Sequence, residues 1–283
     1  NVRADLRTDK PYRRIRAEPT TGYLGAEVSG VALSKPLDAE LFAEIMRAWH
    51  ENLVIAFRDQ AITPTIIESL GARFGKLTIT SYANSVPGYK FAHSLIRAAD
   101  VPRGERNFGD SWHMDQTVRP IPNAGFLLYS VDCPPFGGDT MWANSALAYS
   151  MLSEAMQKMI AGLKVHFSMR DVLASAQANA EQRDSPIGRL VAMKDLPPAV
   201  LTKVRGNMHP LVRTHARSGE KSLYVDPSYA IGLEGFREDE AAPLLKYLND
   251  HLTQAAFTCR LRWEPGMLAL WDNRLCLHQA FND

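Results

Sequence analysis

The sequence has the composition of an ordinary globular protein. Of its 283 residues, 46% are hydrophobic and 22% are charged, which excludes an intrinsically disordered, collagen-like or coiled-coil chain. The 32 Lys and Arg residues nearly balance the 31 Asp and Glu residues, so no overall field favours nucleic acid or a membrane surface as a partner. A chain of this length is expected to bury a large core, as one or two domains.

Two further features bear on location. The sequence has no apolar run near the roughly 18 residues that cross a bilayer, and its basic, polar start does not resemble a secretory signal. The three cysteines, Cys133, Cys259 and Cys276, show no C-x-x-C spacing. We therefore expect reduced thiols in a cytoplasmic protein.

The first part of the chain alternates strands and helices. In order, we expect a strand over 22–30, a helix over 38–51, a strand over 53–57 and a helix over 64–74. Asp38 can cap the first helix, and Pro64 suits the first position of the second.

After Gly109, short apolar segments separated by Pro and Gly predict a mostly antiparallel β core. The strands are expected at 125–129, 140–142, 211–215, 222–225, 257–263 and 267–271. Helices are expected over 144–163, ended by Gly162, and over 237–253. The stretch 168–207 has weak periodicity, and two interpretations stay open, a surface insertion or a lid over a site.

The central chemical signal is the run Trp112-His113-Met114-Asp115. In a strand, His113 and Asp115 would point to the same side and present an imidazole and a carboxylate to one cavity. This is two thirds of the 2-His-1-carboxylate triad that holds non-haem Fe(II), and His278, after a strand and a polar turn, is a candidate for the third ligand. The pattern alone is weak, because a lone His near an apolar segment is more often a hydrogen-bonded core residue.

Further motifs occur in a fixed order along the chain. They are Gly22-Tyr23-Leu24-Gly25-Ala26-Glu27-Val28-Ser29-Gly30, Phe57-Arg58-Asp59-Gln60-Ala61-Ile62-Thr63, Arg73-Phe74-Gly75, Trp112-His113-Met114-Asp115, Gly137-Gly138-Asp139-Thr140-Met141-Trp142, His209-Pro210-Leu211-Val212-Arg213-Thr214-His215 and Leu270-Trp271-Asp272-Asn273-Arg274, followed by His278. In this order the motifs resemble the taurine and aryloxyalkanoate (TauD/TfdA-type) family of Fe(II)- and 2-oxoglutarate-dependent dioxygenases, from about Gly22 to Asp283.

The resemblance implies a mainly β fold with helical insertions, a double-stranded β-helix or jelly roll. It implies a single domain over 1–283, with the β-helix core at about 109–283 and an N-terminal α/β portion at 17–108. It also implies His113, Asp115 and His278 as metal ligands, with Fe(II), 2-oxoglutarate and O2 as cofactor and co-substrates. Family members are often dimers or tetramers, so a homo-oligomer is expected.

The resemblance also indicates how 2-oxoglutarate would bind. Thr140 matches a threonine that contacts its distal carboxylate, although a β-branched residue after a Gly-Gly turn also suits a purely structural role. The family's carboxylate-binding arginine lies about a dozen residues after the second histidine ligand, which here falls beyond Asp283, so we expect the protein to continue past this sequence. Arg274 is expected to pair with Asp272 or a neighbouring carbonyl instead.

Substrate binding is expected to involve Thr80, Gly109, Met169 and Tyr224, by resemblance to the taurine enzyme. Thr80 and Gly109 stand where that enzyme has a histidine and an asparagine, and the loss of these hydrogen-bonding groups disfavours taurine. We therefore expect hydroxylation, and possible cleavage, of a small organic anion such as an aryloxyalkanoate, with decarboxylation of 2-oxoglutarate to succinate.

Three alternatives remain open from the sequence. One is a taurine, sulfonate or alkyl-sulfate dioxygenase of the same family. Another is a zinc-dependent hydrolase that uses the same three ligands, although no general base is apparent. The third is a non-catalytic jelly-roll binding protein.

Overall fold

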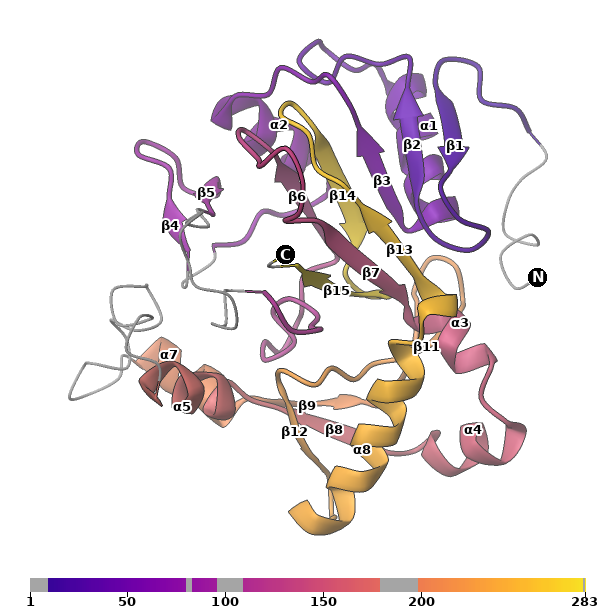
Figure 1. Cartoon of the computed structure of the whole chain (residues 1–283), viewed down its shortest axis with the longest axis vertical. Helices are drawn as coiled ribbons and strands as arrows, with labels where there is room; N and C mark the ends of the chain where they lie inside the picture. Colours follow the sequence, from indigo (N-terminus) through magenta and orange to yellow (C-terminus); the bar gives the residue numbers. More distant parts are fainter. Residues whose placement is uncertain (1–9, 80–82, 96–108, 179–197, 282) are drawn as a thin grey trace.

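The chain combines helices with several small β-sheets, as the computed structural model in Figure 1 shows. The structure describes residues 10–79, 83–95, 109–178, 198–281 and 283. The helices are α1 (Ala39–Asn52), α2 (Pro64–Phe74), α3 (Ser145–Ser150), α4 (Glu154–Ile160), α5 (Arg170–Ala178), α7 (Pro198–Arg205) and α8 (Glu238–Leu252), with a 3-10 turn at Ala255–Phe257. Within this described part, no helix has both the length and the apolar character needed to cross a membrane.

The largest sheet joins strands from both ends of the chain. Its order is β1 (Arg16–Pro19), β2 (Ala26–Ser29), β3 (Val54–Phe57), β14 (Leu268–Asp272) and β6 (Gly125–Tyr129). β2 and β3 run parallel, whereas the other neighbours are antiparallel. Because β14 pairs with β3 on one side and β6 on the other, the N-terminal strands share a sheet with the segment that leads to the candidate site.

The inner strands β3 and β14 of this sheet are buried on both faces, which explains their continuous apolar runs. On β3, Ile55 and Phe57 face a core shared with α1, whereas Val54 and Ala56 face a second core on the opposite side. That second core also contains Trp142 of β7, so it joins the large sheet to a second sheet.

The second sheet carries the candidate site. It consists of β13 (Thr258–Leu261), β7 (Thr140–Asn144) and β15 (Cys276–Ala280), with the antiparallel β7 in the centre. A third sheet contains β12 (Ala230–Leu233), β8 (Lys164–Phe167) and β9 (Asn207–Pro210) and packs against α8 (Figure 1). Two small hairpins complete the described strands, β10 (Val212–Thr214) with β11 (Lys221–Leu223) and β4 (Asn84–Ser85) with β5 (His93–Ser94).

The helix predictions are confirmed for α1, α2 and α8, and the prediction for 144–163 is wrong in one respect. The side chain of Asp38 accepts a hydrogen bond from the N–H of Leu41, as a helix cap should, and Pro64 is the first residue of α2. The segment 144–163 forms two helices, because α3 ends at Ser150 and Ser153 caps α4 by accepting from the N–H of Met156.

The predicted strands after Gly109 are all present in part, whereas β8, β9, β12 and β15 were not expected. Of the stretch 168–207, the described residues include α5 and α7, while residues 179–197 lie outside the described part of the chain. The two interpretations of this stretch, an insertion or a lid, remain predictions.

Candidate metal centre

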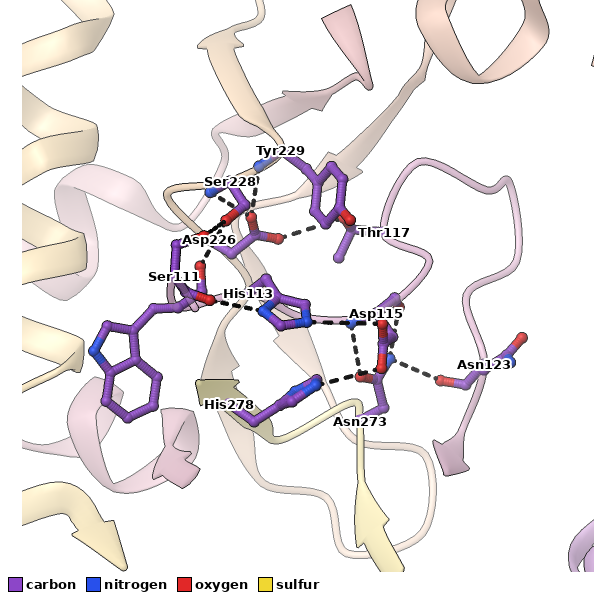
Figure 2. A network of polar contacts seen from close by, with 11 residues as sticks. Ser111, His113, Asp115, Thr117, Asn123, Asp226, Ser228, Tyr229, Asn273 and His278 are labelled. Carbon is purple, nitrogen blue, oxygen red and sulfur yellow. Dashed lines mark hydrogen bonds and ion pairs between the residues drawn. The ribbon is translucent and has the colours of Figure 1, made fainter. Parts of the chain in front are cut away.

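His113 and His278 meet through their backbones. The N–H of His113 donates to the carbonyl of His278 over 3.0 Å, and the N–H of His278 donates back over 2.8 Å. This antiparallel bridge brings the two imidazole rings to a centroid separation of 4.1 Å (Figure 2). Residues that are 165 positions apart in the chain are thereby joined, because β15 presents His278 beside the loop that carries His113.

Asp115 completes the cluster, but not from a strand as predicted. His113 forms only an isolated bridge, and the backbone turns at Asp115. The carboxylate still reaches both imidazoles: Oδ1 lies 3.9 Å from Nε2 of His113 and Oδ2 lies 3.4 Å from Nε2 of His278. One potential ligand atom from each residue lies within 4.8 Å of the others, so the three side chains could hold one metal ion.

A hydrogen bond to the backbone orients the His113 ring. Its Nδ1 lies 2.8 Å from the carbonyl oxygen of Ser111, which can only accept, so Nδ1 carries the hydrogen. This bond leaves Nε2, which lies on the side of Asp115, as the ring nitrogen available to a metal. A ligating histidine commonly has its other ring nitrogen bonded in this way.

Burial disfavours the charged forms of two of the three candidate ligands. Burial raises the pKa of Asp115, although His113 opposes that shift. Burial also lowers the pKa of His278 well below its usual value, and the neighbouring His113 adds to the effect. His278 is thus held neutral, the form that binds metals, and the two nitrogens and one carboxylate match the donors that suit Fe(II).

A second carboxylate anchors the loop that carries His113. Asp226 accepts hydrogen bonds from the N–H groups of Ser228 and Tyr229, over 2.9 and 2.7 Å, and from the Thr117 hydroxyl over 3.4 Å. The Ser228 hydroxyl donates to the carbonyl of Trp112 (Figure 2). Burial raises the pKa of Asp226 to about 6 despite these bonds. The loop is therefore fixed at two points by side chains from one turn.

Asn273 fixes the loop from the other side. Its Oδ1 accepts from the N–H of Asp115 over 3.0 Å, and its Nδ2 donates to the carbonyl of Asp115 over 2.8 Å. The sequence analysis gave no role to Asn273 or Asp226. Asn273 lies in the polar turn after an apolar strand, and that position was the feature of the sequence that could have indicated its role. Asp226 follows the apolar run 223–225, and nothing else in the local sequence indicates its role.

Thr140 lies on the same sheet as His278. Thr140 pairs with Ala280 and His278 pairs with Trp142, so both side chains project from one face, at diagonal positions. The indole N–H of Trp263 donates to Thr140 Oγ1 over 2.9 Å. Because the hydroxyl accepts this bond, its own hydrogen remains available for another acceptor.

The structure describes three of the four predicted substrate residues. Gly109 adjoins the metal cluster: a Cβ there would lie 3.5 Å from Cε1 of His113, and its φ of +82° favours glycine. Met169 and Tyr224 are 2% and 0% exposed and belong to the core around Phe167. Thr80 lies outside the described residues. The substrate roles of all four stay predictions.

Arg274 pairs with Asp272, as expected. The backbone N–H and Nε of Arg274 donate to Oδ1 over 3.0 and 2.8 Å, and Nη2 donates to Oδ2 over 2.5 Å. His215 Nε2 lies 3.3 Å from the same carboxylate. Burial alone would raise the pKa of Asp272, but the bonds and charges of Arg274 and His215 outweigh it and lower the pKa to about 2.

Comparison with known proteins connects this geometry to a family. Residues 16–281 match the family described as "Taurine catabolism dioxygenase TauD, TfdA family". An alpha-ketoglutarate-dependent sulfate ester dioxygenase of Pseudomonas putida is 32% identical over 99% of this chain and 88% of its own length. An alpha-ketoglutarate-dependent 2,4-dichlorophenoxyacetate dioxygenase of Cupriavidus pinatubonensis is 29% identical over 94% of this chain and 92% of its own.

Solved structures show the same similarity. A taurine dioxygenase from Burkholderia xenovorans superposes with a TM-score of 0.72 at 30% identity, covering 96% of this chain and 85% of that protein. The structure of AAD-2 in complex with Mn(II) and N-oxalylglycine superposes with a TM-score of 0.73 at 26% identity, covering 94% and 90%.

The ion pair of Asp272 predicts a pH-dependent stability. A carboxylate whose pKa falls from 3.8 to about 2 on folding stabilises the fold above pH 4, and this stabilisation is lost as the pH falls through 2. Asp272→Asn should therefore lower the free energy of unfolding by about 2 kcal/mol at pH 7, and by about half of that at pH 3. Urea denaturation at both pH values measures the difference.

Asp239→Asn is the control, because Asp239 pairs with Arg237 on the exposed start of α8 and its removal should change stability little. A loss at Asp272 that is equal at pH 7 and pH 3 would contradict the ion-pair account.

Proposed function

The chain belongs to the TauD/TfdA family of 2-oxoglutarate-dependent dioxygenases, and on that premise we propose that it uses Fe(II) to oxidise a small organic anion. The observation that carries the proposal is the cluster of the buried His113 and His278 with the largely buried Asp115, whose potential ligand atoms lie within 4.8 Å of one another. The donor set, two imidazoles and one carboxylate, fits an iron centre that leaves positions open for other ligands.

His113, Asp115 and His278 are the proposed ligands. When bound, iron and 2-oxoglutarate supply the oxidising chemistry, in which O2 and 2-oxoglutarate yield CO2, succinate and an oxidised substrate carbon. The protein holds His113 Nε2 and His278 Nε2 on either side of the Asp115 carboxylate, and burial keeps the His278 ring neutral. Little movement is then needed when the metal arrives, because the three side chains already share one site.

Thr140 is the proposed contact for the distal carboxylate of 2-oxoglutarate. Its hydroxyl shares a sheet face with His278, and Trp263 already occupies one of its acceptor positions. The hydroxyl hydrogen therefore remains available to donate, and a carboxylate of a co-substrate bound at the metal would be a suitable acceptor.

The proposed substrate carries an anionic group on a small organic body. The relatives include enzymes named for sulfate esters and for 2,4-dichlorophenoxyacetate, so alkyl sulfates and sulfonates stand beside aryloxyalkanoates as candidates. The absence of a side chain at Gly109, beside His113, leaves room there but offers no side-chain donor. This supports a substrate that does not need a polar contact at that position.

The remaining proposals concern architecture. The two facing sheets, with β14 and β7 at their shared core, support a double-stranded β-helix within a single domain over 1–283. A homo-oligomer is proposed because members of the family are often dimers or tetramers. A cytoplasmic location is proposed because the three cysteines form no disulfide with one another.

Succinate release tests the activity directly. The full-length protein, supplied with Fe(II), O2 and 2-oxoglutarate, should release succinate with at least one member of a panel of aryloxyalkanoates, alkyl sulfates and sulfonates. His113→Ala should abolish turnover and metal binding, because one of three ligands is lost. His166→Ala on β8 is the control, since that ring bonds only the carbonyl of Arg205 in the described contacts. Full turnover by His113→Ala would exclude the proposed ligand set.

Substitution of Thr140 tests the co-substrate site. Thr140→Val keeps the shape but removes the hydroxyl, and a lost hydrogen bond to a charged group should raise KM for 2-oxoglutarate about tenfold or more. Thr140→Ser keeps the hydroxyl and should stay close to the wild type. Steady-state kinetics with 2-oxoglutarate as the varied reactant measure both, and an unchanged KM in the valine variant would contradict the assignment.

A further inference from the structure

The backbone of Asp115 is not paired with a β-strand, although its carboxylate must be directed toward the two histidines. Two residues earlier, His113 exchanges backbone hydrogen bonds with His278. At Asp115 the chain leaves this bridge and enters a turn, in which Gln116 has a φ of +60°. A left-handed conformation is uncommon for a residue with a side chain and costs about 1 kcal/mol or more, so surrounding contacts must hold it.

Asn273 supplies the contacts that a neighbouring strand would make. Its amide accepts from the N–H of Asp115 and donates to the carbonyl of Asp115, so both polar backbone groups of this residue are satisfied by one side chain. Figure 2 shows Asn273 lying beside Asp115, on the side opposite Asp226. Asn273 is 0% exposed, so water does not compete for these bonds.

The same side chain ties Asp115 to a third segment. Nδ2 of Asn273 also donates to the carbonyl of Asn123 over 3.3 Å, and the backbone N–H of Asn273 donates to the carbonyl of Ala124 over 3.0 Å. The turn that contains Asn273 is therefore fixed against the segment that leads into β6, through contacts that involve none of the three candidate ligands.

This turn also determines where His278 lies. It connects β14 to β15, and β15 presents His278 five residues after Asn273. The salt bridge between Asp272 and Arg274 closes the turn around Asn273. One turn thus holds Asp115 through an amide and His278 through the strand that follows it.

We propose that Asn273 is a positioning residue for the metal centre: its amide pairs with the backbone of Asp115 and presets the carboxylate between the two histidines. The inference rests on the proposed metal site, and it adds a residue that touches neither the metal nor a substrate. Its substitution should weaken metal binding about 10- to 100-fold, the range typical of residues that orient a ligand.

The test compares two buried asparagines. Asn273→Ala removes the amide from Asp115. Asn144→Ala is the matched control, because Asn144 is also 0% exposed and makes three hydrogen bonds, to Tyr23, Ala146 and Leu147, none of which is a proposed ligand. Both variants should lose stability, so a purely structural role predicts similar behaviour.

The readout is Mn²⁺ binding to the full-length protein, measured by the electron paramagnetic resonance signal of free Mn²⁺, with urea denaturation of the metal-free protein alongside. We expect the Kd for Mn²⁺ to rise at least tenfold in Asn273→Ala and to stay within twofold of the wild type in Asn144→Ala. Asn273→Ser, which keeps a shorter polar group, should fall between Asn273→Ala and the wild type, and it replaces the alanine variant if that variant does not fold.

Several results would overturn the assignment. An unchanged Kd in Asn273→Ala, or an equal loss in both asparagine variants, would show that the amide does not act on the metal centre specifically. Failure of both Asn273 variants to fold, while Asn144→Ala folds, would assign the residue to the fold as a whole. A wild-type protein that does not bind Mn²⁺, or a His113→Ala variant that binds it equally well, would instead overturn the proposed site itself, and this inference with it.

Discussion

A largely buried carboxylate held between two imidazoles is the constraint on which the rest of the structure depends. Burial raises the pKa of Asp115 and lowers that of His278, so burial disfavours the charged form of each group. A fold that keeps such groups together must hold them through other contacts. Those contacts are the backbone bridge between His113 and His278 and the side chains of Asn273 and Asp226.

The sheets supply the rigid part of this arrangement. β14 is buried on both faces and pairs with β3 and β6, so the turn that follows it begins from a well-defined position. β15 then runs along β7, which places His278 and Thr140 on one face of the second sheet. The proposed metal and co-substrate contacts therefore follow from strand register.

Beyond the bridge at His113, the loop from Ser111 to Thr117 is held by side chains instead of by a neighbouring strand. Asp226 and Ser228 hold it from one turn, and Asn273 holds it from another (Figure 2). Such anchors fix a few backbone groups without extending a sheet over the site. This arrangement leaves the side chains of His113 and Asp115 directed toward a shared centre, as a metal site with open positions requires.

The sequence predicted the cluster better than it predicted how the cluster is held. The spacing of His113 and Asp115 suggested side chains on one side of a strand; the two side chains do meet, but in a bridge and a turn. The hydrogen bonds that take the place of a strand partner join Asp115 to Asn273, which is 158 positions away in the chain. No local pattern in the sequence predicts a contact between residues so far apart. Similarly, helical periodicity extended through 144–163, whereas Ser153 begins a second helix there, because a hydroxyl cap competes with helix continuation.

The central claim is that His113, Asp115 and His278 hold one divalent metal. A crystal structure of the protein grown with Mn²⁺, with anomalous diffraction recorded at an energy where manganese scatters strongly, tests it most directly. The account predicts one anomalous peak within bonding distance of His113 Nε2, His278 Nε2 and an oxygen of Asp115. A map with no peak between these three side chains, in crystals where Mn²⁺ is in excess, would contradict it.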